Sequence, residues 1–230
     1  MIDLVNRETI FKTHANIAHA IYEFQKAFFN LDKLDYIEAD DENSAEFLEH
    51  IHLKDYKVSP QKKYYKVISF EHEDLETFPK TLGKKIALLL YSLEVRNLFV
   101  LSHLKMNFFG NLENPYEPLQ NAYKILKQIT GRWDYKEGFK TNLEDLLSLI
   151  NIAFWIERCD PSAPEYIFFY DIENRLAFYL CKYGNVHTIE YGTEILNLEI
   201  LAEQDWFKID GGCFDKFTED GIIEGRELKL

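Results

Sequence analysis

Near the start of the chain, apolar side chains recur with alternating spacings of four and three residues, which is the period of one helix face. The spacing predicts a long amphipathic helix over residues 7 to 29. Its inward face would carry Ile10, His14, Ile17, Ile21, Phe24 and Phe28. His14 is the polar member of this face, so we expect a buried histidine with a hydrogen-bond partner, and a catalytic histidine is the alternative.

The middle of the chain combines one strand signal with one strongly apolar segment. Residues 62 to 70 are aromatic and β-branched, and they predict a strand. Residues 84 to 108 are apolar on two sides of a helical projection, which predicts the most buried helix of the protein. A thin polar seam of Ser92, Arg96 and His103 divides those two sides. A buried guanidinium needs a carboxylate or carbonyl partner, so the seam is either a structural network or a polar pocket in which Arg96 binds an anion.

Two further helices are expected over residues 118 to 129 and from a capping box at residues 141 to 144 onward to Ile156. Three aromatic runs then predict an antiparallel meander over residues 165 to 191. Gly184 and Asn185 would form its second turn, as a two-residue loop of type II′.

The C-terminal part gives weaker signals. Residues 193 to 207 fit either a helix or a strand, and residues 222 to 230 predict a final strand. The fold class that follows is α+β, as one domain over residues 1 to 230. In this prediction a helix-rich part, to about residue 158, packs against a β-rich part over residues 159 to 230.

Charge is unevenly distributed along the chain. Lys and Arg total 26 against 39 Asp and Glu, a formal net charge of −13. Residues 32 to 55 carry nine acids and two bases, which is more than half of that net charge. An acidic chain is a poor nucleic-acid binder, because neutralising phosphates needs a surplus of Lys and Arg. The segment is therefore either a solvated face or a docking surface for a basic protein, and the candidate contact residues are Asp40, Asp41, Glu42, Glu46 and Glu49.

Targeting, membrane and metal signals are weak. The acidic start at Asp3 does not resemble a signal peptide, and no apolar run reaches the ~20 residues of a membrane helix. We therefore expect a cytoplasmic protein that binds neither membrane nor nucleic acid. His50 and His52 diverge on a helix, so no metal site or other cofactor is expected.

Catalytic signatures are missing from the sequence. It contains no Gly-rich phosphate loop, paired-histidine zinc helix, nucleophile elbow or Cys-x-x-Cys motif. The proposed two-residue turn puts Cys181 and His187 on opposite faces of the sheet, which argues against a thiol–imidazole pair. We expect the three cysteines, Cys159, Cys181 and Cys213, to be free, non-catalytic thiols.

In composition the chain resembles bacterial immunity proteins, which are often small, acidic and free of catalytic signatures. The resemblance implies an inhibitor of a basic, nuclease-like toxin. The first hypothesis is therefore a cytoplasmic protein-binding module. The alternative is an enzyme, a hydrolase for example, with a polar pocket formed by Arg96, His103 and His14 together with Ser92.

Overall fold

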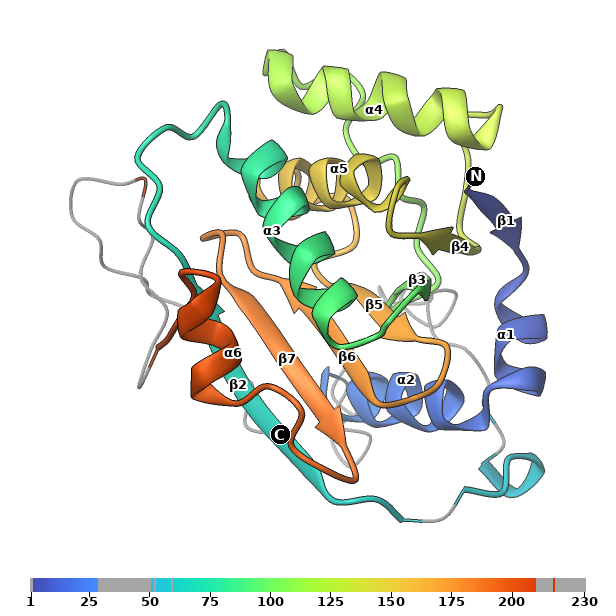
Figure 1. The fold of residues 1–230 in the computed structure, drawn as a ribbon. Coiled ribbons are helices and arrows are strands. Elements are labelled where there is room, and N and C mark those ends of the chain that lie inside the picture. Colours follow the sequence, from blue (N-terminus) through green and yellow to red (C-terminus); the bar gives the residue numbers. More distant parts are fainter. Residues whose placement is uncertain (1, 29–50, 52, 59, 210–216, 218–230) are drawn as a thin grey trace.

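The computed structural model describes residues 2–28, 51, 53–58, 60–209 and 217. The architecture is a mixed α+β fold built on one eight-stranded antiparallel sheet (Figure 1), in the order β1-β4-β3-β5-β6-β7-β2-β8. The strands are β1 (Asp3–Val5), β2 (Lys63–Ser69), β3 (Asn97–Ser102), β4 (Gly138–Asn142), β5 (Ile167–Asp171), β6 (Leu176–Leu180), β7 (Val186–Tyr191) and β8 (Phe207–Lys208).

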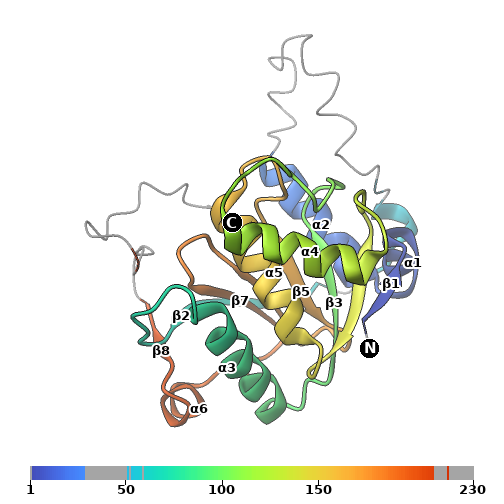
Figure 2. The same ribbon diagram turned by 90° about the horizontal axis from the view of Figure 1, so that it is seen from above.

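Helices cover both faces of this sheet. They are α1 (Arg7–Thr13), α2 (Ala15–Phe28), α3 (Phe78–Ser92), α4 (Glu117–Thr130), α5 (Leu146–Cys159) and α6 (Leu198–Glu203), with a short 3₁₀ turn, η4, at Leu53–Asp55. On one face, α1 and α2 pack on aromatic side chains of the central strands. On the other face, α3 and α5 lie side by side and α4 packs outside α5 (Figure 2). Among the described helices, none has the length and apolar character that a membrane-spanning helix needs.

The central strands lie between these two layers and are buried on both faces. All five residues of β5 and all five of β6 are buried. A sheet covered on both sides selects continuous apolar runs in place of alternating ones. This requirement explains the dense aromatic composition of the C-terminal third of the chain.

The prediction of one buried helix over residues 84 to 108 is wrong. Helix α3 ends at Ser92, Glu94 adopts a positive φ of 58°, and the chain then enters strand β3. A central strand is buried on both faces, so its apolar pattern resembles that of a helix buried all round. The segment is thus a buried helix end followed by a buried strand.

Two other boundaries differ from the predictions. The predicted helix over residues 7 to 29 divides at His14, whose φ of −133° and ψ of 74° end α1 before α2 begins. Strand β4 occupies part of the predicted capping box, and α5 starts only at Leu146. Four strands (β1 to β4) precede residue 158, so helices and strands alternate there and do not form a separate helical part.

The antiparallel meander is confirmed, because β5 pairs with β6 and β6 pairs with β7 in antiparallel register. Its second turn is longer than predicted, since Leu180 faces Val186 and Cys181 donates its N–H to the carbonyl of Asn185. Gly184 takes a φ of +83° inside this loop, a conformation that glycine adopts without steric cost. The predicted strand at 62–70 and helix at 118–129 are confirmed as β2 and α4. The predicted strand at 222–230 lies outside the described residues.

One buried ion pair joins β2, β7 and the chain that leads to α6. The ammonium of Lys66 contacts the carboxylate of Glu190, and the side chains of these residues are 10% and 0% exposed. The other carboxylate oxygen of Glu190 accepts the N–H groups of Ile195 and Leu196, at 2.5 and 2.8 Å. A buried carboxylate is tolerated when its oxygens are paired in this way. Glu190 therefore fixes the path of the chain after β7.

Glu190→Gln is expected to lower the free energy of unfolding by about 3–5 kcal/mol, because it leaves the buried Lys66 ammonium with only the exposed carboxylate of Glu194 as counter-charge. Urea unfolding at neutral pH measures this change. Glu194→Gln is the matched control, since Glu194 lies 3.0 Å from the same ammonium but its side chain is 54% exposed. The control substitution should lower the free energy of unfolding by less than about 1 kcal/mol. Equal decreases in the free energy of unfolding for the two variants would contradict the role of Glu190 as the buried counter-charge of Lys66.

Candidate functional site

The acidic residues predicted to contact a partner, Asp40, Asp41, Glu42, Glu46 and Glu49, lie outside the described residues, as do His50 and His52. The described residues on either side of them can be located. The preceding helix α2 ends at Phe28, and Ile51 is buried in the apolar cluster under α1 and α2. The acidic segment is therefore attached at both ends to the α1–α2 face of the sheet.

The predicted polar seam is not assembled by the fold. Ser92 is the last residue of α3, and its hydroxyl accepts the side-chain amide of Gln204 at 3.1 Å. Arg96 is exposed in the turn before β3, where its guanidinium lies 4.3 Å from the centre of the Tyr91 ring and donates to the Tyr91 carbonyl. It is neither buried nor directed toward His103. The expected offsets of a helix do not apply, because a turn separates these residues.

His14 and His103 both lie on the α1–α2 side of β3, but they do not meet. The imidazole of His14 contacts the edge of the Phe99 ring at 4.7 Å and bonds the Thr13 hydroxyl at 2.8 Å. His103 is four residues further along the chain than Phe99, a distance of about 13 Å along an extended strand. The predicted pocket around Arg96, His103 and His14 is thus absent.

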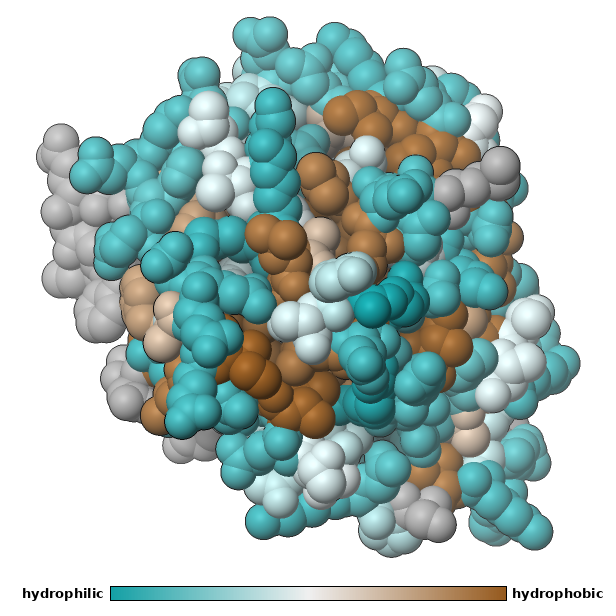
Figure 3. Space-filling view, in the orientation of Figure 1, coloured by the Kyte–Doolittle hydropathy of each residue, from teal (hydrophilic) through white to brown (hydrophobic). Residues whose placement is uncertain are grey.

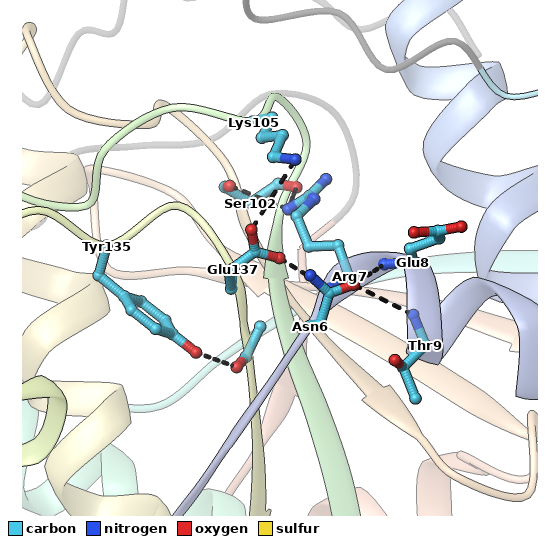
Figure 4. A network of polar contacts seen from close by, with 9 residues as sticks. Asn6, Arg7, Glu8, Thr9, Ser102, Lys105, Tyr135 and Glu137 are labelled. Atoms are coloured by element: carbon cyan, nitrogen blue, oxygen red, sulfur yellow. Dashed lines mark hydrogen bonds and ion pairs between the residues drawn. The ribbon is translucent and has the colours of Figure 1, made fainter.

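The fold instead buries an arginine that the sequence analysis did not single out. Arg7, the first residue of α1, is 0% exposed, and its Nη1 donates to the carbonyl and the hydroxyl of Ser102 at 2.9 and 3.2 Å. Its backbone N–H donates to Glu137, which also lies 3.8 Å from the ammonium of Lys105 (Figure 4). These contacts tie the start of α1 to the end of β3. A single arginine in a first helical turn carries no sequence signal of burial.

His103 belongs to the same buried region. It is 2% exposed, and its carbonyl accepts the side-chain amide of Gln25 at 3.1 Å. Burial, reinforced by the positive charge of Arg7, lowers the pKa of the His103 imidazole to about 4. The imidazole is therefore neutral near pH 7 and shielded from solvent, as expected of a structural histidine.

The candidate site is a groove on the other face of the sheet. It lies where the end of β2, the helix α3 and the α6–β8 segment meet, and it encloses about 630 Å³. The residues that line it are Phe70, Glu71, Lys85, Ala202, Asp205, Trp206 and Phe207. Phe70 and Trp206 are buried and pack edge to face at 5.3 Å, whereas Phe207 is 42% exposed. Apolar surface near α3 and α6 is bordered by hydrophilic residues in the space-filling view (Figure 3).

One cation of the chain already lies against the aromatic rings of the groove. The ammonium of Lys85 is 5.3 Å from the centre of the Phe70 ring and 5.7 Å from that of Trp206. It donates to the Gln204 carbonyl at 2.5 Å and lies 3.9 Å from the Asp205 carboxylate. Asp205 adopts a φ of +56° at the end of α6, a conformation that is uncommon for residues other than glycine. The groove thus combines aromatic rings with charged groups of both signs.

The surroundings of the groove are acidic. Residues 71–76 and 194–205, which flank it, contain one histidine, His72, no Lys or Arg, and eight acids: Glu71, Glu73, Asp74, Glu76, Glu194, Glu199, Glu203 and Asp205. A surface lined by one sign of charge raises the local concentration of ligands of the opposite sign. Sequence reasoning missed this cluster, because its two halves are far apart in the chain and no local pattern places residues 194–205 beside residues 71–76.

The described residues give no support to metal or thiol chemistry. Among them, no three His, Cys, Asp or Glu side chains are placed to hold a metal ion. Cys159 is a half-buried free thiol, Cys181 is half-buried, and Cys213 lies outside the described residues. The imidazole of His187 stacks on Tyr179 at 4.7 Å, and Cys181 lies in the turn beyond that strand.

Comparison with known proteins adds no relative. No family model, no curated protein sequence and no solved structure matches the chain.

Stability should fall in acid because His103 stays neutral in the folded protein. Unfolding returns the imidazole to its ordinary pKa of 6.5, so the unfolded state binds more protons between pH 6.5 and about 4. Across that window His103 should remove about 3 kcal/mol of stability. Urea unfolding from pH 7 to pH 4 should therefore show a steeper loss in wild type than in His103→Gln, whose side chain does not titrate. If the free energy of unfolding falls equally with pH in wild type and in His103→Gln, His103 makes no such contribution.

Proposed function

We propose that this protein is a binding module for a protein partner with a basic surface. The observation that carries the proposal is the division of charge along the chain. The described residues hold 22 Lys and Arg against 25 Asp and Glu, and so are close to balance. Residues 29–50 hold eight acids and one base, and residues 210–230 hold six acids and three bases. The negative charge is therefore concentrated in two segments.

Negative charge that is concentrated in two segments suits the recognition of a basic partner better than it suits solubility alone. A complementary potential speeds the encounter of two proteins and disfavours partners of the wrong sign. Solubility needs only a net charge away from zero, which a dispersed distribution would supply equally well. The described residues on either side of residues 29–50 lie on the α1–α2 face, which supports that face as the first region of contact.

The most specific form of the proposal is an immunity-type inhibitor of a nuclease-like toxin in the cytoplasm. A nuclease must present a positive surface to phosphates, and an acidic inhibitor would compete for that same surface. The half-buried free thiol of Cys159 suits a reducing compartment. The enzyme alternative has lost its main support, because Arg96, His103 and His14 do not form a pocket.

Reversal of three acids tests the proposal. Asp40→Lys, Asp41→Lys and Glu42→Lys together should slow association with the basic partner by about tenfold or more at low salt, and should change dissociation much less. The difference should shrink as salt is added, because the Debye length is about 10 Å at 0.1 M ionic strength. A partner is isolated on the immobilised protein, purified, and its rates are measured at two salt concentrations.

The matched control reverses Glu113, Asp134 and Glu144, three exposed acids of the described part. It makes the same change in net charge at other places in the chain. If wild type and the first variant associate with the partner at equal rates, the proposal is contradicted. Residues 32 to 55 would then serve solubility only. Equal slowing by both variants would assign the effect to overall charge and not to this segment.

A further inference from the structure

We propose that the groove between β2, α3 and α6 binds an arginine side chain of the basic partner. This inference rests on the proposed function and specifies one contact within it. The groove offers aromatic side chains, two carboxylates at its edge and an acidic surrounding surface. These are the groups that recognise a planar cation.

The aromatic floor already binds a cation from within the chain. The Lys85 ammonium lies within 6 Å of two ring centres, which is the range of a cation–π interaction. It is also fixed by the carbonyl of Gln204, so it forms part of the wall. The exposed ring of Phe207 and the carboxylates of Glu71 and Asp205 line the same groove. A second cation would use these groups.

Charge selects a cationic occupant in spite of Lys85. The flanking segments supply eight acids and neither Lys nor Arg, and the side chain of Asp205 is 95% exposed. An anionic occupant would face this acidic surface with Lys85 as the single base among the described lining residues. A guanidinium suits the groove better than an ammonium does, because it stacks on aromatic rings and can donate to two carboxylates at once.

Two buried polar atoms of the α6–β8 segment also lack hydrogen-bond partners among the residues that the structure describes. They are Oε1 of Gln204, an acceptor that suits a guanidinium, and Nε1 of Trp206, a donor that a guanidinium cannot satisfy because it has no acceptor. Buried polar groups are almost always paired in native proteins, and exceptions concentrate at functional sites. The positive φ of Asp205, which lies between these two residues, is a second departure from relaxed geometry in the same segment.

A direct test uses a capped pentapeptide with one central arginine, and versions with lysine or citrulline at that position. Citrulline keeps the shape of arginine and removes its charge. Binding is followed by NMR through the indole N–H signal of Trp206, with the signals of Trp133 and Trp155 as internal references. The arginine peptide should bind at least tenfold more tightly than the citrulline peptide and should shift the Trp206 signal most.

Glu71→Gln combined with Asp205→Asn should weaken binding of the arginine peptide by fivefold or more. Asparagine tolerates the positive φ of position 205, so the fold should persist. The control pair, Glu113→Gln with Asp134→Asn, removes two exposed acids far from the groove in sequence and should weaken binding less than twofold. Equal weakening by both pairs, or equal binding of the citrulline peptide, would overturn the inference. Equal binding of the lysine peptide would overturn its guanidinium specificity.

The peptide experiment needs no natural partner, so its failure is separable from failure of the proposed function. One outcome is that the protein does not bind the peptides, while charge reversal at residues 40 to 42 slows its association with the partner. This outcome would support the proposed function and contradict the groove inference. A protein that binds the arginine peptide in the groove, but whose partner association is unaffected by that reversal, would show the opposite.

Discussion

The carboxylate of Glu190 is the polar contact on which the candidate site depends. It neutralises Lys66 across two neighbouring strands, and it holds the N–H groups of Ile195 and Leu196 as the chain leaves the sheet. That path delivers α6 to the edge of α3, where the carbonyl of Gln204 meets the ammonium of Lys85. The aromatic floor of the groove therefore depends on a buried charge that is not itself part of the groove. Such a charge is stable only while all its partners remain in place.

Burial on both faces of the sheet determines which parts of the fold could be predicted. Helix α4 has a polar outer face, and Gly131, with a φ of 71°, caps its C-terminal end. Both the helix and its end could therefore be predicted from the sequence. The meander was recognisable from its aromatic runs and turn residues. The segment from residue 84 to 108 was not, because an apolar pattern on two sides describes a buried helix and a central strand equally well. The positive φ of Glu94, where the helix turns into the strand, has no signature in the sequence.

The candidate site was harder to predict than the fold, for a related reason. Its aromatic and charged groups come from β2, α3 and the α6–β8 segment, and only the sheet order brings these together. The predicted seam of Ser92, Arg96 and His103 relied on helical offsets and failed when the helix ended at Ser92. The histidine at position 14 was placed on the correct face, since it contacts Phe99 under α1 and α2, but it is half-buried where a buried side chain was expected. Burial of Arg7 depends on its tertiary contact with Ser102, which local pattern does not encode.

The two acidic features differ in how they would act on a basic partner. The segment of residues 32 to 55 carries more than half of the net negative charge of the protein. It would attract a basic partner over distances of about one Debye length. The groove places two carboxylates beside aromatic rings, where a bound cation would lose part of its water and interact at contact distance. Salt screens the first effect strongly, and it also screens the Asp205 carboxylate, whose side chain is 95% exposed. The contact of a guanidinium with an aromatic ring adds a short-range interaction that needs no counter-charge. Encounter and retention of the partner would then respond to different residues, and a change in one rate need not alter the other.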